Sequence, residues 1–249
     1  MAEQAPGQAK LTAKLGPYLD KGTFGIAAKD MQSNREYRLA DDRVFDGGST
    51  LKLAILAYLF NQASNNQFDL NETVTIQRAD VQNYGTGSLR YQNMPQTLSY
   101  RQLVLLITKQ SDNTAAHVLG QRLNEERVQE FVNRIGLTNT SMVNHSTTAR
   151  DMLLLVEKLY RGELADPALT KELLEQMRGT DFEDRLPAKL PAGTIVSHKT
   201  GDAIDGGYHD VGIVERDGKV YAAAIFSHAV PFPLLPDISR EVFDYMTQG

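Results

Sequence analysis

The chain has 249 residues, of which 41% are hydrophobic and 23% charged, a composition typical of a globular protein with a substantial core. Its net charge of -5 offers no basic surface for phosphate groups, so nucleic acid is not expected as the main partner. The absence of cysteine excludes disulfides, cysteine metal ligands and thiol catalysis. No apolar run reaches the length of a membrane span.

The N-terminal region predicts one helix and two strands. Residues 1–6 lack the charged and apolar regions of a signal peptide, which favours either a cytoplasmic protein or a chain whose signal has been removed. Apolar residues at helical spacing predict a helix over residues 9–19. Two strands are predicted over residues 23–28 and 36–39, around a turn at Ser33-Asn34.

The middle of the chain has a helical pattern. Ser49 and Asp112 precede apolar periodic runs and are residue types that commonly begin helices. Two acidic pairs, Asp41-Asp42 and Glu125-Glu126, are predicted to be solvated. The predicted helices cover residues 50–62, 100–107, 114–123, 125–135, 149–160 and 167–177.

The C-terminal region returns to a period of two, and Asp217-Gly218 predicts a hairpin turn. The predicted elements are strands over residues 194–199, 210–215 and 219–227 and a closing helix over residues 236–248. Strands at both ends of the chain with helices between them indicate the α+β class.

The expected architecture is an antiparallel sheet built from the N- and C-terminal segments, with flanking helices and an inserted all-α lobe. The sheet lobe would be discontinuous, comprising residues 1–46 and 191–249. The helical lobe would comprise residues 47–190, with the active site between the two.

The first motif with chemical content is Ser49-Thr50-Leu51-Lys52. A spacing of three places Ser49 and Lys52 on one helical face, close enough to exchange a proton. A lysine base must be neutral when the serine attacks, so burial or a neighbouring cation has to lower its pKa. Taken alone, Ser49 is better explained as a helix N-cap.

Two further motifs follow in the chain. Ser111-Asp112-Asn113 precedes a predicted helix and, alone, is a capping cluster. Lys199-Thr200-Gly201 ends a predicted strand, where the glycine would admit a substrate backbone and the other two residues offer donors for a carboxylate. Each motif occurs once, in the order and local context of the Ser-x-x-Lys, Ser-Asp-Asn and Lys-Thr-Gly signature.

The sequence therefore resembles the class A β-lactamase-related serine hydrolases, the penicillin-recognising serine enzymes, over almost its whole length. The resemblance implies a β-lactamase/transpeptidase-like fold, no cofactor and no metal. Further similar segments are Gly85-Thr86-Gly87-Ser88-Leu89, Thr147-Thr148-Ala149-Arg150-Asp151-Met152, Leu190-Pro191-Ala192-Gly193 and His209-Asp210-Val211-Gly212.

The resemblance assigns the catalytic roles. Ser49 would be the nucleophile and Lys52 its base. Ser111 would relay a proton to the leaving nitrogen. Lys199 would help to keep Lys52 neutral and would also hold the substrate carboxylate.

Substrate-binding roles follow from the same resemblance. Asn113 would hold the substrate amide, and Tyr84 would flank the cleft. Thr200 would bind the substrate carboxylate beside Gly201. The backbone N–H of Asp202 would form the oxyanion hole with that of Ser49.

The sequence departs from the family in the shortened Ω-loop. Hydrolytic class A enzymes carry Glu-x-x-Leu-Asn there, whereas Leu137–Ser146 is short and has no carboxylate. Losing a positioned base costs about 10²–10⁴ in rate, so acylation would survive while deacylation slows. His145 is an alternative base, although a surface or capping histidine is the better explanation. The next candidate for the missing carboxylate, in Glu183–Leu186, corresponds to a different helix of the family.

Asp202 is the second departure, because it puts a carboxylate beside the expected pocket for the substrate carboxylate. Repulsion would weaken the binding of anionic β-lactams unless Lys199, Arg185 or another cation offsets it. Alternatively, the side chain points to solvent and only the backbone matters. The remaining histidines lack the spacing of metal ligands.

Three functions remain open. The first is a β-lactam-hydrolysing acyl enzyme with slow or atypical deacylation. The second is a D-Ala-D-Ala carboxypeptidase or related peptidoglycan hydrolase, and the third is a penicillin-binding sensor or structural module without turnover. All imply a small β-lactam or peptidoglycan peptide as the partner of a monomer without a membrane span. The resemblance implies a periplasmic or other extracytoplasmic location.

Overall fold

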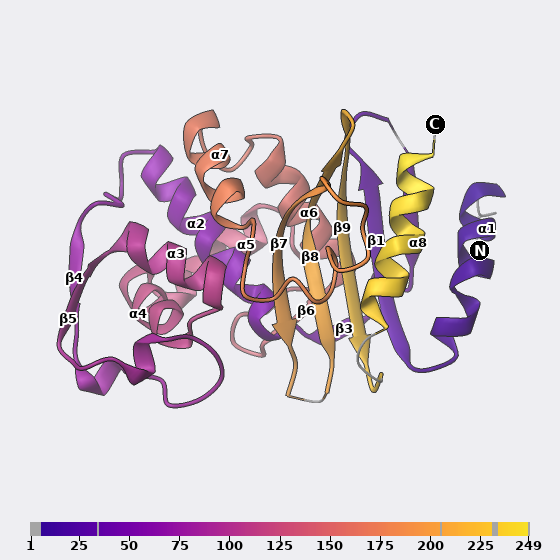
Figure 1. The fold of residues 1–249 in the computed structure, drawn as a ribbon. Coiled ribbons are helices and arrows are strands. Elements are labelled where there is room, and N and C mark those ends of the chain that lie inside the picture. Colours follow the sequence, from indigo (N-terminus) through magenta and orange to yellow (C-terminus); the bar gives the residue numbers. More distant parts are fainter. Residues whose placement is uncertain (1–5, 34, 205, 231–233, 249) are drawn as a thin grey trace.

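A five-stranded antiparallel sheet in the order β2-β1-β9-β8-β7 forms the centre of the computed structural model (Figure 1). The structure describes residues 6–33, 35–204, 206–230 and 234–248. Two strands come from the N-terminal part of the chain and three from the C-terminal part, which confirms the predicted α+β fold. The strands are β1 (Thr23–Asp30), β2 (Glu36–Leu39), β7 (Ile195–Asp202), β8 (Tyr208–Arg216) and β9 (Lys219–His228).

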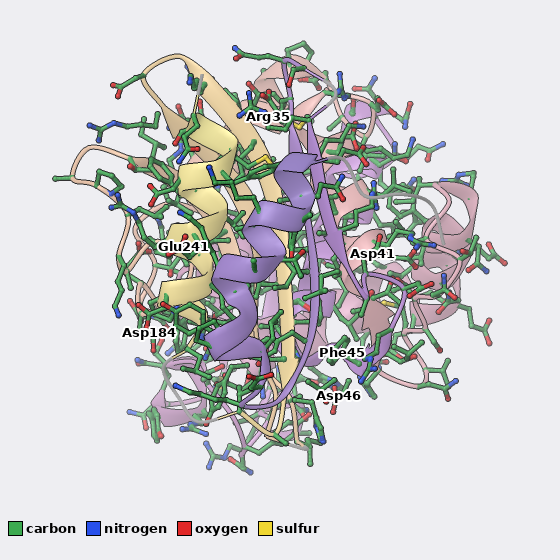
Figure 2. All side chains as sticks on the ribbon, turned by 90° about the vertical axis from the view of Figure 1, so that its right-hand side faces the viewer. Arg35, Asp41, Phe45, Asp46, Asp184 and Glu241 are labelled. Carbon is green, nitrogen blue, oxygen red and sulfur yellow. The ribbon has the colours of Figure 1, made fainter. Side chains whose placement is uncertain are left out.

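Helices cover both faces of the sheet. On one face α1 (Pro6–Leu19) and α8 (Leu235–Thr247) lie side by side, as the rotated view in Figure 2 shows from the front. Their apolar faces, including Leu15 and Ile238, are fully buried against the strands. On the other face, α6 (Ala149–Tyr160) packs against β1, β8 and β9. The remaining α-helices are α2 (Lys52–Ser64), α3 (Tyr100–Gln110), α4 (Asn113–Leu123), α5 (Glu125–Arg134) and α7 (Pro167–Gln176).

The structure contains two short antiparallel strand pairs that were not predicted from the sequence. β3 (Val44–Asp46) pairs with β6 (Ser146–Thr148), and β4 (Thr73–Ile76) pairs with β5 (Gln96–Ser99). These four strands are only three or four residues long, at or below the lower limit of the alternating runs that indicate a strand in a sequence. The β3–β6 ladder matters for the site because it joins the chain just before Ser49 to the segment just before α6.

The entry into α2 differs from the prediction. Ser49 does not cap an α-helix: it lies inside a 3₁₀ turn over Gly48–Leu51, and α2 begins at Lys52 with Leu51 as its N-cap. Neither N-cap residue, Gly47 for the turn or Leu51 for α2, caps its helix with a side-chain hydrogen bond. The tight turn is held instead by Thr50, whose N–H and hydroxyl both donate to the Gly47 carbonyl. The Ser49 hydroxyl is therefore not the cap of this helix.

One predicted surface pair is partly buried. Asp41 is only 6% exposed, and its carboxylate accepts hydrogen bonds from Arg38 and from both Nε and Nη2 of Arg150. It thereby ties the turn after β2 to the start of α6, whereas Asp42 is exposed as predicted. Asp41 and Arg150 are 109 positions apart in the sequence, so their contact could not be predicted from local patterns.

The lobe boundaries at residues 46/47 and 190/191 stay a prediction. Helix α6 belongs to the predicted helical lobe, yet it supplies one of the layers that cover the sheet. Within the described residues, no helix is both long and apolar enough to cross a bilayer.

The central position of α2 makes its core side chains sensitive to truncation. Leu56 is 0% exposed in the larger apolar cluster, so Leu56→Ala should lower the free energy of unfolding by about 2–5 kcal/mol. Leu105→Ala removes the same atoms from a 45% exposed site on α3 and should cost much less. Urea titration of both variants checks this, and equal losses would contradict the placement of Leu56.

Candidate active site

Two lysines and one serine hydroxyl meet between α2, the α3–α4 junction and β7. The ammonium group of Lys52 donates to the Ser111 carbonyl oxygen (2.5 Å), to Ser111 Oγ (3.1 Å) and to Asn113 Oδ1 (2.6 Å). Lys199 Nζ donates to the same Ser111 Oγ (2.9 Å) and to the Thr200 carbonyl (2.9 Å). Residues from three distant parts of the sequence therefore form one connected cluster.

Burial changes the acidity of both lysines. It lowers the pKa of Lys52 to about 8, against the opposing charge of Asp112. Burial and the nearby charge of Lys52 lower the pKa of Lys199 well below its usual value. A Lys52 amine with a pKa near neutrality is free base often enough to accept a proton. A serine hydroxyl has two acceptor lone pairs, so Ser111 can serve both lysines and still donate its own hydrogen.

The α3–α4 junction holds Ser111 in place. Ser111 ends α3 with φ 53° and ψ 35°, the left-handed conformation, which turns the chain sharply into α4. Asp112 caps α4 by accepting from Ala115 N (2.9 Å), as the sequence predicted, and also accepts from Leu89 N (2.9 Å). Thr86 Oγ1 donates to the Ser111 carbonyl (2.8 Å).

The loop before α3 fits closely around this junction. Asn113 Nδ2 donates to the Tyr84 carbonyl (3.1 Å), so its amide oxygen faces Lys52. Gly85 has φ +68°, and a Cβ there would lie 2.2 Å from Asn113 Nδ2. Tyr84 thus adjoins the cluster through its backbone, while its side chain is 66% exposed.

The end of β7 packs directly on the turn that carries Ser49. A Cβ at Gly201 would lie 2.8 Å from Thr50 N and 2.9 Å from the Gly47 carbonyl, so glycine permits this close backbone approach. Gly48 has φ +49°, and a Cβ there would lie 2.4 Å from the Asp202 carbonyl. Thr200 is 5% exposed beside this contact. The strand end and the serine turn are therefore neighbours.

The chain before the serine turn lies at the same end of the sheet. Asp46, at the end of β3, accepts from Gly48 N (2.9 Å). Figure 2 shows Asp46 low in the molecule, the end at which β7 and β8 are connected in Figure 1.

The Asp202 carboxylate makes an ion pair with Arg185. Arg185 is 3% exposed and also donates through Nη1 to the carbonyls of Gly201 (2.9 Å) and His209 (3.0 Å). The Asp202 side chain is also 57% exposed, so features of both alternatives that the sequence left open, pairing with Arg185 and exposure to solvent, are present.

The segment after α5 is short and tied down at several points. Asp151 of α6 accepts from Asn139 N (2.8 Å) and Thr140 Oγ1 (2.8 Å), and the His145 carbonyl accepts from Gly47 N (2.8 Å). The exposed His145 thus contributes its backbone to the serine turn. Within the described parts of the chain, none of the hydrogen-bond partners of the Lys52 ammonium is a carboxylate.

A buried charge network adjacent to Lys199 was missed from the sequence. His198 is 0% exposed, and its Nδ1 lies 2.9 Å from both carboxylate oxygens of Asp210, while Nε2 lies 3.1 Å from Glu183 Oε1. Burial opposes the imidazolium, but the two carboxylates outweigh it and raise the pKa of His198 to about 9. Asp210 also accepts from Leu186 N (2.9 Å), so the network ties residues 183–186 to β7 and β8.

The network is an ion pair cluster, not a metal site. Across the residues that the structure describes, no three His, Asp or Glu side chains are grouped so as to hold a metal ion. A His followed by Lys on a strand, with an Asp on the next strand, was the signal available in the sequence. The spacing of the histidines in the sequence does not reveal the two carboxylates that His198 contacts in the fold.

The family model for the beta-lactamase enzyme family matches residues 8–246, nearly the whole chain. The chain belongs to this family. The extended-spectrum beta-lactamase PER-1 of Pseudomonas aeruginosa is 25% identical over 233 residues, covering 83% of this chain and 75% of PER-1. A beta-lactamase of Bacillus licheniformis is 25% identical over 227 residues, covering 81% of this chain and 69% of its own length.

Solved structures of the family superpose over nearly the full chain. A PBP-A variant, solved as its acyl-enzyme complex with penicillin G, has a TM-score of 0.87 and 28% identity, covering 96% of this chain and 95% of its own. The TLA-1 extended-spectrum beta-lactamase has a TM-score of 0.89 at 21% identity, covering 97% of this chain and 100% of its own, and supports the fold. The protein is therefore a serine hydrolase of the β-lactamase and penicillin-binding type by family.

The raised pKa of His198 predicts a pH-dependent stability. A folded pKa of about 9 against an unfolded pKa near 6.5 gives stabilisation that is complete below about pH 6.5 and lost as pH rises through about 9. The contribution is about 3 kcal/mol. The difference in unfolding free energy between the wild type and His198→Gln should therefore shrink from pH 6 to pH 10, by roughly that amount.

Urea titrations across this pH range provide the measurement. Glu183→Gln keeps the pair of His198 with Asp210 and should retain part of the decline, which separates the two carboxylates. Parallel pH profiles for the wild type and His198→Gln would show that His198 is not charged in the folded protein.

Proposed function

We propose that the protein reacts with β-lactams through an acyl-enzyme at Ser49 and releases the acyl group slowly. The observation that carries this proposal is the Lys52–Ser111–Lys199 cluster, in which Lys52 has a lowered pKa and no carboxylate among its hydrogen-bond partners. The cluster supplies the groups for acylation, but no base for the second step.

Acylation follows from the placement of these groups. Lys52 follows Ser49 by three residues across the 3₁₀ turn, a spacing that aligns side chains in that conformation, and it takes the proton as Ser49 Oγ attacks the β-lactam carbonyl. The backbone N–H groups of Ser49 and Asp202 stabilise the oxyanion, because β7 packs on the serine turn. Ser111 gives its hydroxyl hydrogen to the leaving nitrogen and is reprotonated through the lysines that it contacts.

Binding roles are assigned to the side chains around this centre. Asn113 presents its amide group beside Lys52 and orients the substrate amide. Thr200 and Lys199 bind on the leaving-group side, and Tyr84 lines the rim. No cofactor takes part in these steps.

Deacylation needs a water activated on the face of the ester opposite to the leaving group. Residues 137–150 contain no carboxylate. Asp151 is buried, and its carboxylate accepts hydrogen bonds from Asn139 N and Thr140 Oγ1. Without a positioned base the hydrolysis of the ester slows by about 10²–10⁴, which matches a penicillin-binding protein better than an efficient β-lactamase.

The second candidate is a D-Ala-D-Ala carboxypeptidase of the cell envelope. The likeness to PBP-A, whose variant was captured as an acyl-enzyme with penicillin G, favours it, as does the short segment after α5. Such an activity requires a location outside the cytoplasm. A penicillin-binding sensor uses the same acylation and differs in having no turnover.

Intact-protein mass spectrometry after mixing with benzylpenicillin tests the nucleophile. A long-lived adduct on the wild type, absent from Ser49→Ala, is expected. Ser33→Ala, at an exposed turn after β1, is the matched control and should form the adduct normally. An adduct on Ser49→Ala would refute the nucleophile, and rapid return to free enzyme with the antibiotic consumed would refute slow deacylation. Release of D-Ala from a peptide ending in D-Ala-D-Ala would support the second candidate.

The pH dependence of acylation tests the base. The acylation rate should rise with pH through about 8, because the free-base form of Lys52 accepts the proton. Lys52→Arg stays protonated, so it should lose this rise and acylate about 10²–10⁴ times more slowly. Lys10→Arg, an exposed change on α1, should behave like the wild type. An unchanged pH profile in Lys52→Arg would assign the base to another group.

A further inference from the structure

The ion pair between Arg185 and Asp202 lies at the end of β7 that packs on the serine turn. Arg185 is almost completely buried, with its side chain 4% exposed, whereas 57% of the Asp202 side chain is exposed. The guanidinium donates to the carbonyls of Gly201 and His209, and its Cζ lies 5.5 Å from the centre of the Tyr208 ring. The arginine is therefore held rigidly, and the aspartate is the solvent-facing member of the pair.

The Asp202 carboxylate neutralises the charge of Arg185, which would otherwise be available to a substrate carboxylate. A second carboxylate, that of Asp184, lies 3.6 Å from Arg185 Nε. Arg185 therefore has two carboxylates against its single charge, and the group carries a net negative charge at its exposed side. Lys199, a lysine of the same strand, is buried and engaged by Ser111 and Thr200.

Asp202 lies on the same side of β7 as the threonine that adjoins the site. Successive side chains of a strand point to opposite faces, so Thr200 and Asp202 share a face and are about 7 Å apart along the strand. Gly201, between them, faces the serine turn. A group bound at Thr200 therefore lies within strong electrostatic reach of the Asp202 carboxylate.

We propose that Asp202, paired with Arg185, is a specificity determinant that disfavours acyl donors with a carboxylate at Thr200 and favours donors with a neutral or cationic group there. The inference rests on the proposed function, since it names the substrate class of that site. An uncharged donor avoids the repulsion, and a cation gains from it. The preferred substrate is accordingly a peptide or lactam whose leaving side is amidated, esterified or basic.

The alternative role for the pair is purely structural. In that case Asp202 would fix the conformation of the strand end, and its loss would slow all donors alike. The exposed carboxylate and the buried arginine, already anchored by two backbone carbonyls, favour the electrostatic role. A ratio of rate constants for two donors is unaffected by damage that slows both equally, so it separates the electrostatic role from the structural role.

Benzylpenicillin and its methyl ester form such a readout, because they share the acyl group and differ only in the carboxylate. The measured quantity is the ratio of their second-order acylation rate constants at Ser49, followed by intact mass. Asp202→Asn keeps the shape and removes the charge, so the ratio of acid to ester should rise about tenfold. The rise should shrink in high salt, where exposed charges are screened.

Asp217→Asn is the matched control. It makes the same change at an 81% exposed side chain in the β8–β9 turn, at the opposite end of the strands from Asp202, and should leave the ratio unchanged. Asp202→Ser, a smaller neutral residue, should reproduce the effect of Asp202→Asn. Agreement of these two variants excludes an effect of the new amide group.

The outcomes separate the inference from the proposed function. No adduct at Ser49 with either donor, in the wild type and in Asp202→Asn, would overturn the proposed function. Adducts with an acid-to-ester ratio that is the same in the wild type and both Asp202 variants would overturn the inference alone. A fall of both rate constants by the same factor would show the structural role and would also overturn it.

Discussion

One buried hydroxyl, that of Ser111, accepts hydrogen bonds from two lysine ammonium groups, and the site depends on this arrangement. Two like charges cannot both persist near one another away from water, so the cluster favours a state in which at least one lysine is neutral. Burial lowers the pKa of Lys52 to about 8, and the charge of Lys52 adds to burial in lowering the pKa of Lys199. The α3–α4 turn, β7 and the start of α2 are each held where the hydroxyl can reach both lysines.

The close contact between β7 and the serine turn is the second constraint. It joins Gly201 of the edge strand β7 to Thr50, 151 positions earlier in the chain, and it tolerates no side chain at Gly201. A backbone contact of this kind fixes the direction of N–H groups more firmly than side chains could, because it leaves them few rotatable bonds. The contact thereby ties the rigid sheet to the turn that carries Ser49.

Much of the fold and of the site could be predicted from the sequence, because both depend on strong local signals. Periodicity located the long helices and the main strands, and the three motifs located Ser49, Ser111 and Lys199. Through-space pairing could not be predicted: Asp41 with Arg150, His198 with Asp210 and Asp202 with Arg185 each join residues from separate elements. The 3₁₀ turn at Ser49 was also missed, since a serine before an apolar run is a common helix cap.

The backbone of Ser111 narrows which residues that position can hold. Its left-handed conformation costs most residues about 1 kcal/mol and is easiest for glycine and asparagine. Glycine has no oxygen for the lysines, asparagine has no hydroxyl hydrogen to give, and the branched threonine fits poorly at positive φ. Serine alone combines a small side chain with a hydroxyl at this turn. The left-handed backbone and the two lysine contacts together leave serine as the residue type that suits this position.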